Sequence, residues 1–78
     1  MLPALTDREQ QVLELVADGF MNKEIACNLL ISESTVENHI HHIYVKLRIS
    51  NRAQAVAYVF QSRLALLASP IEDRGKPP

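Results

Sequence analysis

Residues 31–47, ISESTVENHIHHIYVKL, carry the clearest helical pattern in this chain. Ser32 precedes the pattern and is a good N-cap residue, since its hydroxyl can accept a hydrogen bond from a free N–H of the first turn. The apolar residues then recur at alternating intervals of four and three, which places them on one stripe of a helix: Val36, Ile40, Ile43 and Leu47. The pattern predicts a helix that begins just after Ser32 and packs this stripe against a core.

The opposite side of this predicted helix carries compact polar groups. At about 100° per residue it presents Ser34, Asn38, His41 and Val45, with Glu37 and His42 on its flanks. Short donors and acceptors of this kind suit recognition of another surface better than long solvating charges do. Any helical bundle has an apolar stripe, however, so the stripe alone does not separate a reading helix from an ordinary bundle helix.

Three further helices are predicted around this one. Residues 6–9, TDRE, match a capping box and begin a helix over 7–18, which Gly19 ends with a left-handed residue. Residues 22–30 form a second, shorter helix, and Ser50 or Asn51 caps a fourth over 52–68. A short helix, a tight connection and a longer helix with a polar outward face are typical of the helix-turn-helix motif.

Length and composition predict one all-α domain over residues 1–68. A chain of 78 residues supports a single core, and 47% hydrophobic residues with two glycines and no tryptophan favour helices. Residues 69–78 are rich in proline and charge, and we expect them to be a disordered tail. The single cysteine, Cys27, excludes an internal disulfide, and the apolar runs are too short to span a membrane. A cytoplasmic location is therefore expected.

The charge of the chain is unevenly distributed. The net charge is −1, yet no acidic residue lies between His39 and Arg63. Residues 32–63 hold four basic side chains and two acidic ones, a sum of +2, and also contain all three histidines. Histidine gains part of a positive charge beside a polyanion. The second half of the chain therefore has a moderately basic surface that suits nucleic acid.

Several linked segments resemble one known family. They are Leu5-Thr6-Asp7-Arg8-Glu9, Asn22-Lys23-Glu24-Ile25-Ala26, Ile31-Ser32, Thr35-Val36, Lys46-Leu47 and Asn51-Arg52-Ala53-Gln54-Ala55. Together they resemble the helix-turn-helix DNA-binding domain of the LuxR/GerE type, found at the C-terminus of NarL/FixJ-class response regulators. The resemblance implies a four-helix domain whose third helix enters the major groove and whose fourth helix packs two copies together.

The resemblance and the outward face of the third helix together assign contacts to DNA. Base contacts are expected from Ser34, Glu37, Asn38 and His41. Phosphate contacts are expected from Asn22, Lys23, Thr35, His42, Lys46 and Arg48. The chain departs from the family pattern at Glu37 and His41, where Lys or Arg is frequent, at Met21, which replaces a capping Ser or Thr, and at Arg48, where a glycine is common. Glu9 and Arg52 match charged positions that are usually structural, and we expect them to pair across the first and fourth helices.

The predicted fourth helix has two apolar stripes about 200° apart. One consists of Ala53, Ala57, Phe60, Leu64 and Leu67, and the other of Ala55, Val59 and Leu66. One stripe should close the core and the other should remain on the surface, where an oligomer contact is expected. The dimer interface is assigned to Ala55, Val59 and Leu66, with a neighbouring domain as the alternative occupant.

The sequence therefore predicts a sequence-specific, dimeric DNA-binding effector domain of a transcription regulator, with double-stranded DNA as its partner. RNA polymerase and an N-terminal receiver or sensor domain are further candidate partners. A sigma-factor-like promoter module and a helical protein-interaction module are the alternatives. An enzyme is not expected, because no nucleophile has an adjacent base and no glycine-rich phosphate loop is present. His39 and His42 lie one turn apart without supporting ligands, so neither a metal nor a cofactor is expected.

Overall fold

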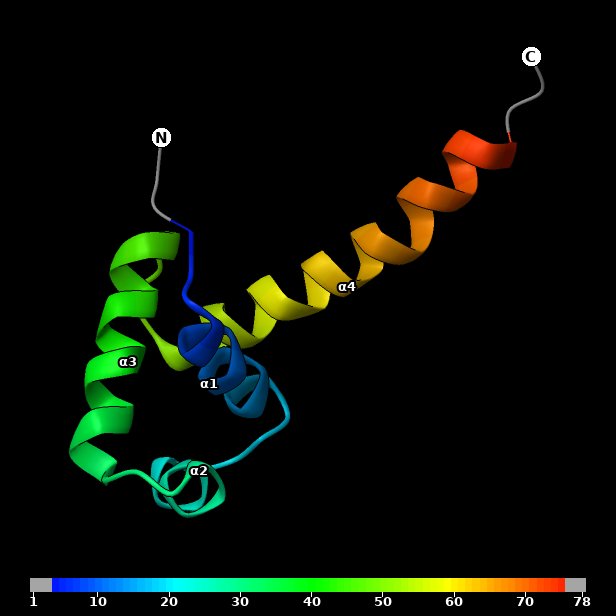
Figure 1. Cartoon of the computed structure of the whole chain (residues 1–78). Helices are drawn as coiled ribbons and strands as arrows, with labels where there is room; N and C mark the ends of the chain where they lie inside the picture. The colour runs from blue at the N-terminus through cyan, green and yellow to red at the C-terminus, as the bar shows by residue number, and fades with distance from the viewer. Residues whose placement is uncertain (1–3, 76–78) are drawn as a thin grey trace.

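The computed structural model describes residues 4–75 of the chain. Its four helices, which contain all of the regular structure in this range, are α1 (Asp7–Ala17), α2 (Asn22–Leu29), α3 (Glu33–Leu47) and α4 (Arg52–Gly75). The predicted all-α, four-helix fold is confirmed. In Figure 1, α1, α2 and α3 gather into one body, and α4 leaves this body as a long helix whose far end stands away from the other three.

The helices begin where local capping groups satisfy their free N–H groups. The Thr6 hydroxyl accepts from the Glu9 N–H at 3.1 Å while the Glu9 carboxylate accepts from the Thr6 N–H at 2.9 Å, which confirms the capping box of α1. The Ser32 hydroxyl accepts from the Thr35 N–H at 3.1 Å at the start of α3. At α2, Glu24 accepts from the Met21 N–H at 2.7 Å. The thioether of Met21 is a poor substitute for a hydroxyl in the reciprocal bond.

α1, α2 and α3 end in the same way. Each is followed by a residue with positive φ, namely Gly19 at 94°, Leu30 at 59° and Arg48 at 57°. The next residue donates its N–H to the carbonyl five positions earlier at 3.0 Å and packs against the core; these residues are Phe20, Ile31 and Ile49. This bond is the mark of a Schellman motif, which satisfies free carbonyls at a helix end. Two of the three ends therefore hold a side chain in a conformation that favours glycine.

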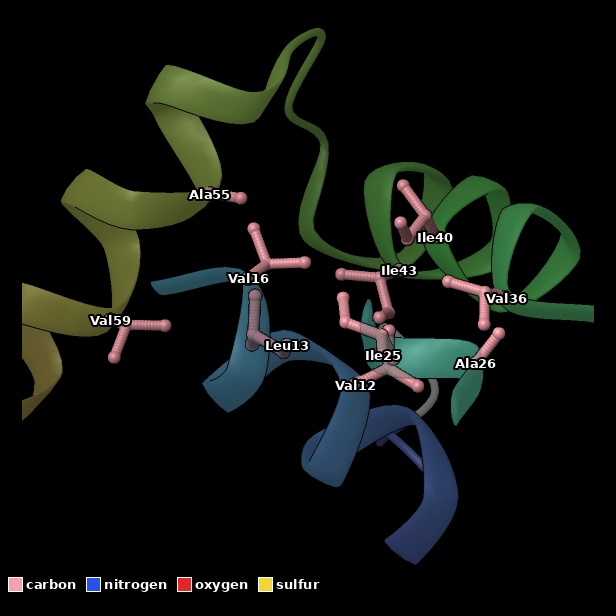
Figure 2. Close-up of a cluster of buried hydrophobic side chains, with 10 residues drawn as sticks. All are labelled: Val12, Leu13, Val16, Ile25, Ala26, Val36, Ile40, Ile43, Ala55 and Val59. Carbon is pink, nitrogen blue, oxygen red and sulfur yellow. The ribbon is translucent and has the colours of Figure 1, made fainter. Parts of the chain in front are cut away.

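The core lies between α1 and the other three helices. α1 packs against α2, α3 and α4, so it is the central element of the fold. Figure 2 shows the buried side chains converging from all four helices. They are Val12, Leu13, Val16, Ile25, Ala26, Val36, Ile40, Ile43, Ala55 and Val59. The predicted apolar stripe of α3 is thus buried, apart from Leu47, which is partly buried at the edge of the core.

The structure corrects the assignment of the two stripes on α4. Ala55 and Val59 are only 1% and 5% exposed and lie in the core, so their assignment to a dimer surface is wrong. The reason is that α1 packs on this side of α4. Leu66 remains exposed, but it lines a groove between α1 and α4 together with Leu13 and Val59. The other stripe, with Phe60, Leu64 and Leu67, faces outward.

The C-terminal end of α4 also differs from the expected boundary. The helix continues past residue 68 to Gly75, where a disordered tail over 69–78 was expected. A helix satisfies its backbone hydrogen bonds within itself, so it can extend without a tertiary partner. Disorder of this segment in solution stays a prediction, and residues 76–78 lie outside the described residues.

Candidate nucleic-acid interface

The polar face of α3 is open to solvent. The four predicted base-contact residues, Ser34, Glu37, Asn38 and His41, are all exposed. Ser34, Asn38 and His41 lie on the side of α3 opposite the buried stripe of Val36, Ile40 and Ile43, which is drawn in Figure 2, and Glu37 lies on the flank. Val45 extends the same face and is also exposed. The expected outward polar face is therefore exposed. We call Ser34, Glu37, Asn38 and His41 the ridge of α3, and its donors and acceptors extend along about two helical turns.

The predicted phosphate ligands differ in solvent exposure and in the contacts that their side chains already make. Lys23 on α2 and Arg48 after α3 are exposed, and the structure records no ion pair for either in its described part. Thr35 is partly buried, with its hydroxyl 2.9 Å from that of Ser32. The side chain of His42 is mostly exposed, and its ring centroid lies 6.0 Å from that of His41. Thr35 and His42 lie on α3 itself, whereas Lys23 lies in the first turn of α2 and Arg48 directly follows α3.

Lys46 has a structural partner. Its Nζ lies 2.7 Å from Glu9 Oε1 on α1 and donates at 3.3 Å to the carbonyl of Ala4. Glu9 is only 4% exposed, whereas the side chain of Lys46 is 20% exposed. The hydrogen bond from Lys46, followed by that from the Thr6 N–H, holds the pKa of Glu9 below its usual value, although burial acts in the opposite direction. One of the three ammonium donors of Lys46 is left for another acceptor.

The expected pairing of Glu9 with Arg52 is wrong. Arg52 donates from Nη1 to Asn22 Oδ1 at 3.0 Å and from Nη2 to the carbonyl of Phe20. This side chain therefore joins the start of α4 to Phe20 before α2 and to Asn22 at its start, and Glu9 pairs with Lys46 instead. Asn22, a predicted phosphate contact, has its carbonyl oxygen occupied and keeps its NH₂ group as a donor. The sequence contained no local signal for these contacts, because the partners are far apart along the chain.

Two searches of the described residues were negative. No group of three histidine, cysteine or acidic side chains lies close enough together to hold a metal ion within that range. No helix described by the structure is sufficiently long and apolar to cross a membrane. His39 is partly buried beside the core stripe of α3, as expected for a packing residue.

The sequence matches known regulators. The family model described as bacterial regulatory proteins of the luxR family matches residues 3–59. The chain is 43% identical over 60 residues to the nitrate/nitrite response regulator protein NarL of Escherichia coli K12, and 45% identical over 60 residues to the response regulator protein VraR of Staphylococcus aureus Mu3. These alignments cover 77% of this chain but only 28% and 29% of the relatives. The chain thus corresponds to less than a third of each relative.

A solved structure agrees with this match. The crystal structure of the response regulator ChrA of a heme-sensing two-component system superposes with a TM-score of 0.72 at 42% sequence identity, over 80% of this chain and 31% of that chain. The matched family contains DNA-binding transcription regulators, not enzymes, and the helix-turn-helix formed by α2 and α3 fits it. The chain therefore belongs to the LuxR family of bacterial regulatory proteins.

Proposed function

We propose that this chain is the sequence-specific effector domain of a transcription regulator, and that it inserts α3 into the major groove of double-stranded DNA as one of two copies. The observation that carries the proposal is the solvent-exposed ridge of Ser34, Glu37, Asn38 and His41 on a helix whose other side is buried. An α-helix with its side chains is about 10–12 Å wide, and the major groove is about 12 Å wide. α3 has the dimensions and the polar face that this groove accepts.

The side chains of the ridge suggest which bases are read. A carboxylate can accept from the exocyclic amine of cytosine, so Glu37 favours a C·G pair. Asn38 has the donor and acceptor that adenine presents at N7 and N6, and it therefore favours an A·T pair. A base that offers Glu37 no amine would leave its carboxylate unpaired in the groove, which makes a wrong base at this position costly. Ser34 and His41 contact the flanking positions.

The residues around the ridge hold the DNA backbone in this proposal. Lys23 and Arg48 supply exposed cationic groups, while Thr35 and His42 supply further donors at the first and later turns of α3. The remaining donor of Lys46 and the NH₂ of Asn22 complete the set. Phosphate contacts fix the register of the protein and carry the salt dependence of binding. Because so few cationic side chains are free, we expect one copy to bind DNA with modest affinity.

Two copies would read two half-sites about 10 base pairs, or about 34 Å, apart. The response-regulator relatives suggest a receiver or sensor domain as the input partner. RNA polymerase is a further proposed partner of the bound regulator. Such a protein works where the DNA is, which in a bacterium is the cytoplasm.

Selection of bound duplexes from a random pool tests the proposal. The chain alone, without polymerase, should enrich a site with paired half-sites, and its affinity should fall as salt rises. Replacing both Asn38 and His41 with alanine should cost about 2–5 kcal/mol of binding to the selected site and relax the base preference there. Asn28→Ala on the exposed side of α2, away from this ridge, is the matched control and should bind normally. No enriched sequence, or equal losses in both variants, would refute the proposal.

A further inference from the structure

Two adjacent histidines on α3, His41 and His42, face different surroundings. Both side chains are exposed, and their ring centroids lie 6.0 Å apart with the ring planes tilted by 55°. Neighbouring residues of a helix differ in direction by about 100°. His41 therefore lies on the ridge of α3, whereas His42 lies beside the ridge, near Glu9 of α1. In Figure 1, α3 forms one side of the body and α1 lies on its inner side.

His42 lies beside a carboxylate that already has a cationic partner. Its Nδ1 is 3.8 Å from Glu9 Oε2, while the Nζ of Lys46 is 2.7 Å from Glu9 Oε1. Lys46 follows His42 by four residues, so the two side chains share one side of α3. A proton on His42 would gain the attraction of Glu9 but would add a second positive charge beside Lys46. These two effects oppose each other.

His41 has a different electrostatic setting. No ion pair joins it to a carboxylate of α1 or α2, the helices that pack on α3, within the part of the chain that the structure describes. On α3 itself, the exposed Glu37 precedes His41 by four residues. A carboxylate one turn before a cation stabilises that cation. Val45, one turn after His41, is uncharged and 61% exposed. The surroundings of His41 therefore favour a proton on its ring.

Protonation changes what an imidazole can recognise. The neutral ring has one donor and one acceptor nitrogen, whereas the protonated ring has two donors and no acceptor. On the major-groove edge, guanine presents the two acceptors N7 and O6, while adenine and cytosine each present an amine donor. A protonated ring therefore matches guanine and is repelled by the amines. Histidine is also the side chain whose charge ordinarily changes between about pH 5 and pH 8.

We propose that His41 is a proton-dependent base reader, which selects guanine at its position in each half-site when its imidazole is protonated, and that His42 does not share this role. The proposal deepens the proposed function and rests on it. It adds which base His41 reads and that mild acidity changes the choice. The DNA phosphates on both sides of the groove attract positive charge and so favour the protonated ring in the complex.

The position of the base follows from the helix geometry. His41 follows Asn38 by three residues, which is about 4.5 Å along a helix axis, and base pairs are about 3.4 Å apart. With α3 lying along the groove, the base read by His41 is therefore the neighbour of the one read by Asn38.

Selection of bound duplexes at two pH values tests the assignment. The full chain should enrich guanine next to the Asn38 position at about pH 6 and should lose this preference at about pH 8. Between two duplexes that differ only in this base pair, the preference for guanine over adenine should rise by at least about fivefold on acidification. Glu9 keeps its charge over this range, because its pKa is lowered from the ordinary value of 4.5, so its contact with Lys46 persists.

Substitutions at the two histidines are matched, because the residues are adjacent and both exposed. His41→Lys is charged at both pH values and should prefer guanine at both. His41→Gln cannot take up a proton and should show one base preference that does not change with pH. His42→Gln removes the neighbouring imidazole and should keep the pH-dependent preference of the parent chain within about twofold.

The outcomes separate this inference from the proposed function. The assignment of His41 would be overturned by the same base preference at both pH values, by enrichment of another base at about pH 6, or by equal loss of the pH dependence in His41→Gln and His42→Gln. Selection at the other positions of the half-site reports on the proposed function alone. A chain that selects half-sites without a pH-dependent base refutes only the role of His41. A chain that selects no sequence at either pH refutes both proposals.

Discussion

Lys46 of α3 donates to the buried carboxylate of Glu9 on α1 across an Nζ–Oε1 distance of 2.7 Å. This contact joins the helix that carries the polar ridge to the central helix of the fold. Glu9 also accepts from the Thr6 N–H as part of the α1 cap, and its other oxygen lies 3.8 Å from His42 Nδ1. One side chain therefore links a helix start to the position of α3, and its removal should be felt in the stability of the domain.

Glu9→Gln is expected to lower the free energy of unfolding by about 1–3 kcal/mol. The amide oxygen can still accept one hydrogen bond, but the attraction between opposite charges is lost, and solvent around Lys46 limits that attraction. Urea unfolding followed by circular dichroism measures the change. Glu14→Gln, an exposed position on the same helix, should stay within about 0.5 kcal/mol of the parent chain. Equal effects of the two substitutions would contradict a structural role for Glu9.

Stability should fall at acid pH through the same carboxylate. The folded pKa of Glu9 is lowered from an ordinary value of 4.5, chiefly by the hydrogen bond from Lys46. A lowered folded pKa gives stability that is fully present above the unfolded pKa and is lost as pH falls through the folded pKa. Urea midpoints measured from about pH 6 down to about pH 3 should therefore decrease below about pH 4.5, and less steeply in Glu9→Gln. If the urea midpoints of the parent chain and of Glu9→Gln fell in parallel as pH decreased, carboxylates other than Glu9 would account for the loss of stability at acid pH.

Arg48→Gly should have opposite effects on stability and on binding. Arg48 holds φ at 57°, so glycine relieves left-handed backbone strain and should stabilise the domain by about 0.5–1 kcal/mol. Loss of the guanidinium should reduce the slope of log affinity against log salt by roughly one. Leu30 has a similar left-handed backbone, with φ at 59°, and its side chain is 89% exposed. Leu30→Gly should therefore give the same stabilisation without changing the slope of log affinity against log salt. An unchanged slope in Arg48→Gly would remove Arg48 from the phosphate contacts.

Arg52 should matter more than Arg63, although both lie on α4. Arg52 donates to Asn22 and to the carbonyl of Phe20, and lysine cannot reach both with the same geometry. Arg52→Lys is expected to cost about 1–2 kcal/mol of stability. Arg63 makes one exposed contact of 3.6 Å with Asp18, so Arg63→Lys should cost less than about 0.5 kcal/mol. Thermal unfolding of the two variants provides the comparison, and a larger loss for Arg63→Lys would be incompatible with these roles.

Features set by neighbours along the chain were predictable from the sequence. The Thr6 and Ser32 caps, the left-handed Gly19 and the start of each helix depend on residues within four or five positions, and the structure contains all of them. The buried stripe of α3 follows in the same way, because one helical period fixes which residues share a face. That stripe also fixed the opposite face, so the exposure of Asn38 and His41 needed no tertiary information.

The tertiary structure alone decided between alternatives that are locally equivalent. Either apolar stripe of α4 could have closed the core, and the packing of α1 chose Ala55 and Val59 and left Phe60, Leu64 and Leu67 outside. Glu9 could have paired with Arg52 or Lys46, and the side of α1 on which α3 lies selected Lys46. The physical reason is the same in both cases. Helical periodicity defines faces within one helix, whereas the partner of each face depends on how separate helices fit together in three dimensions.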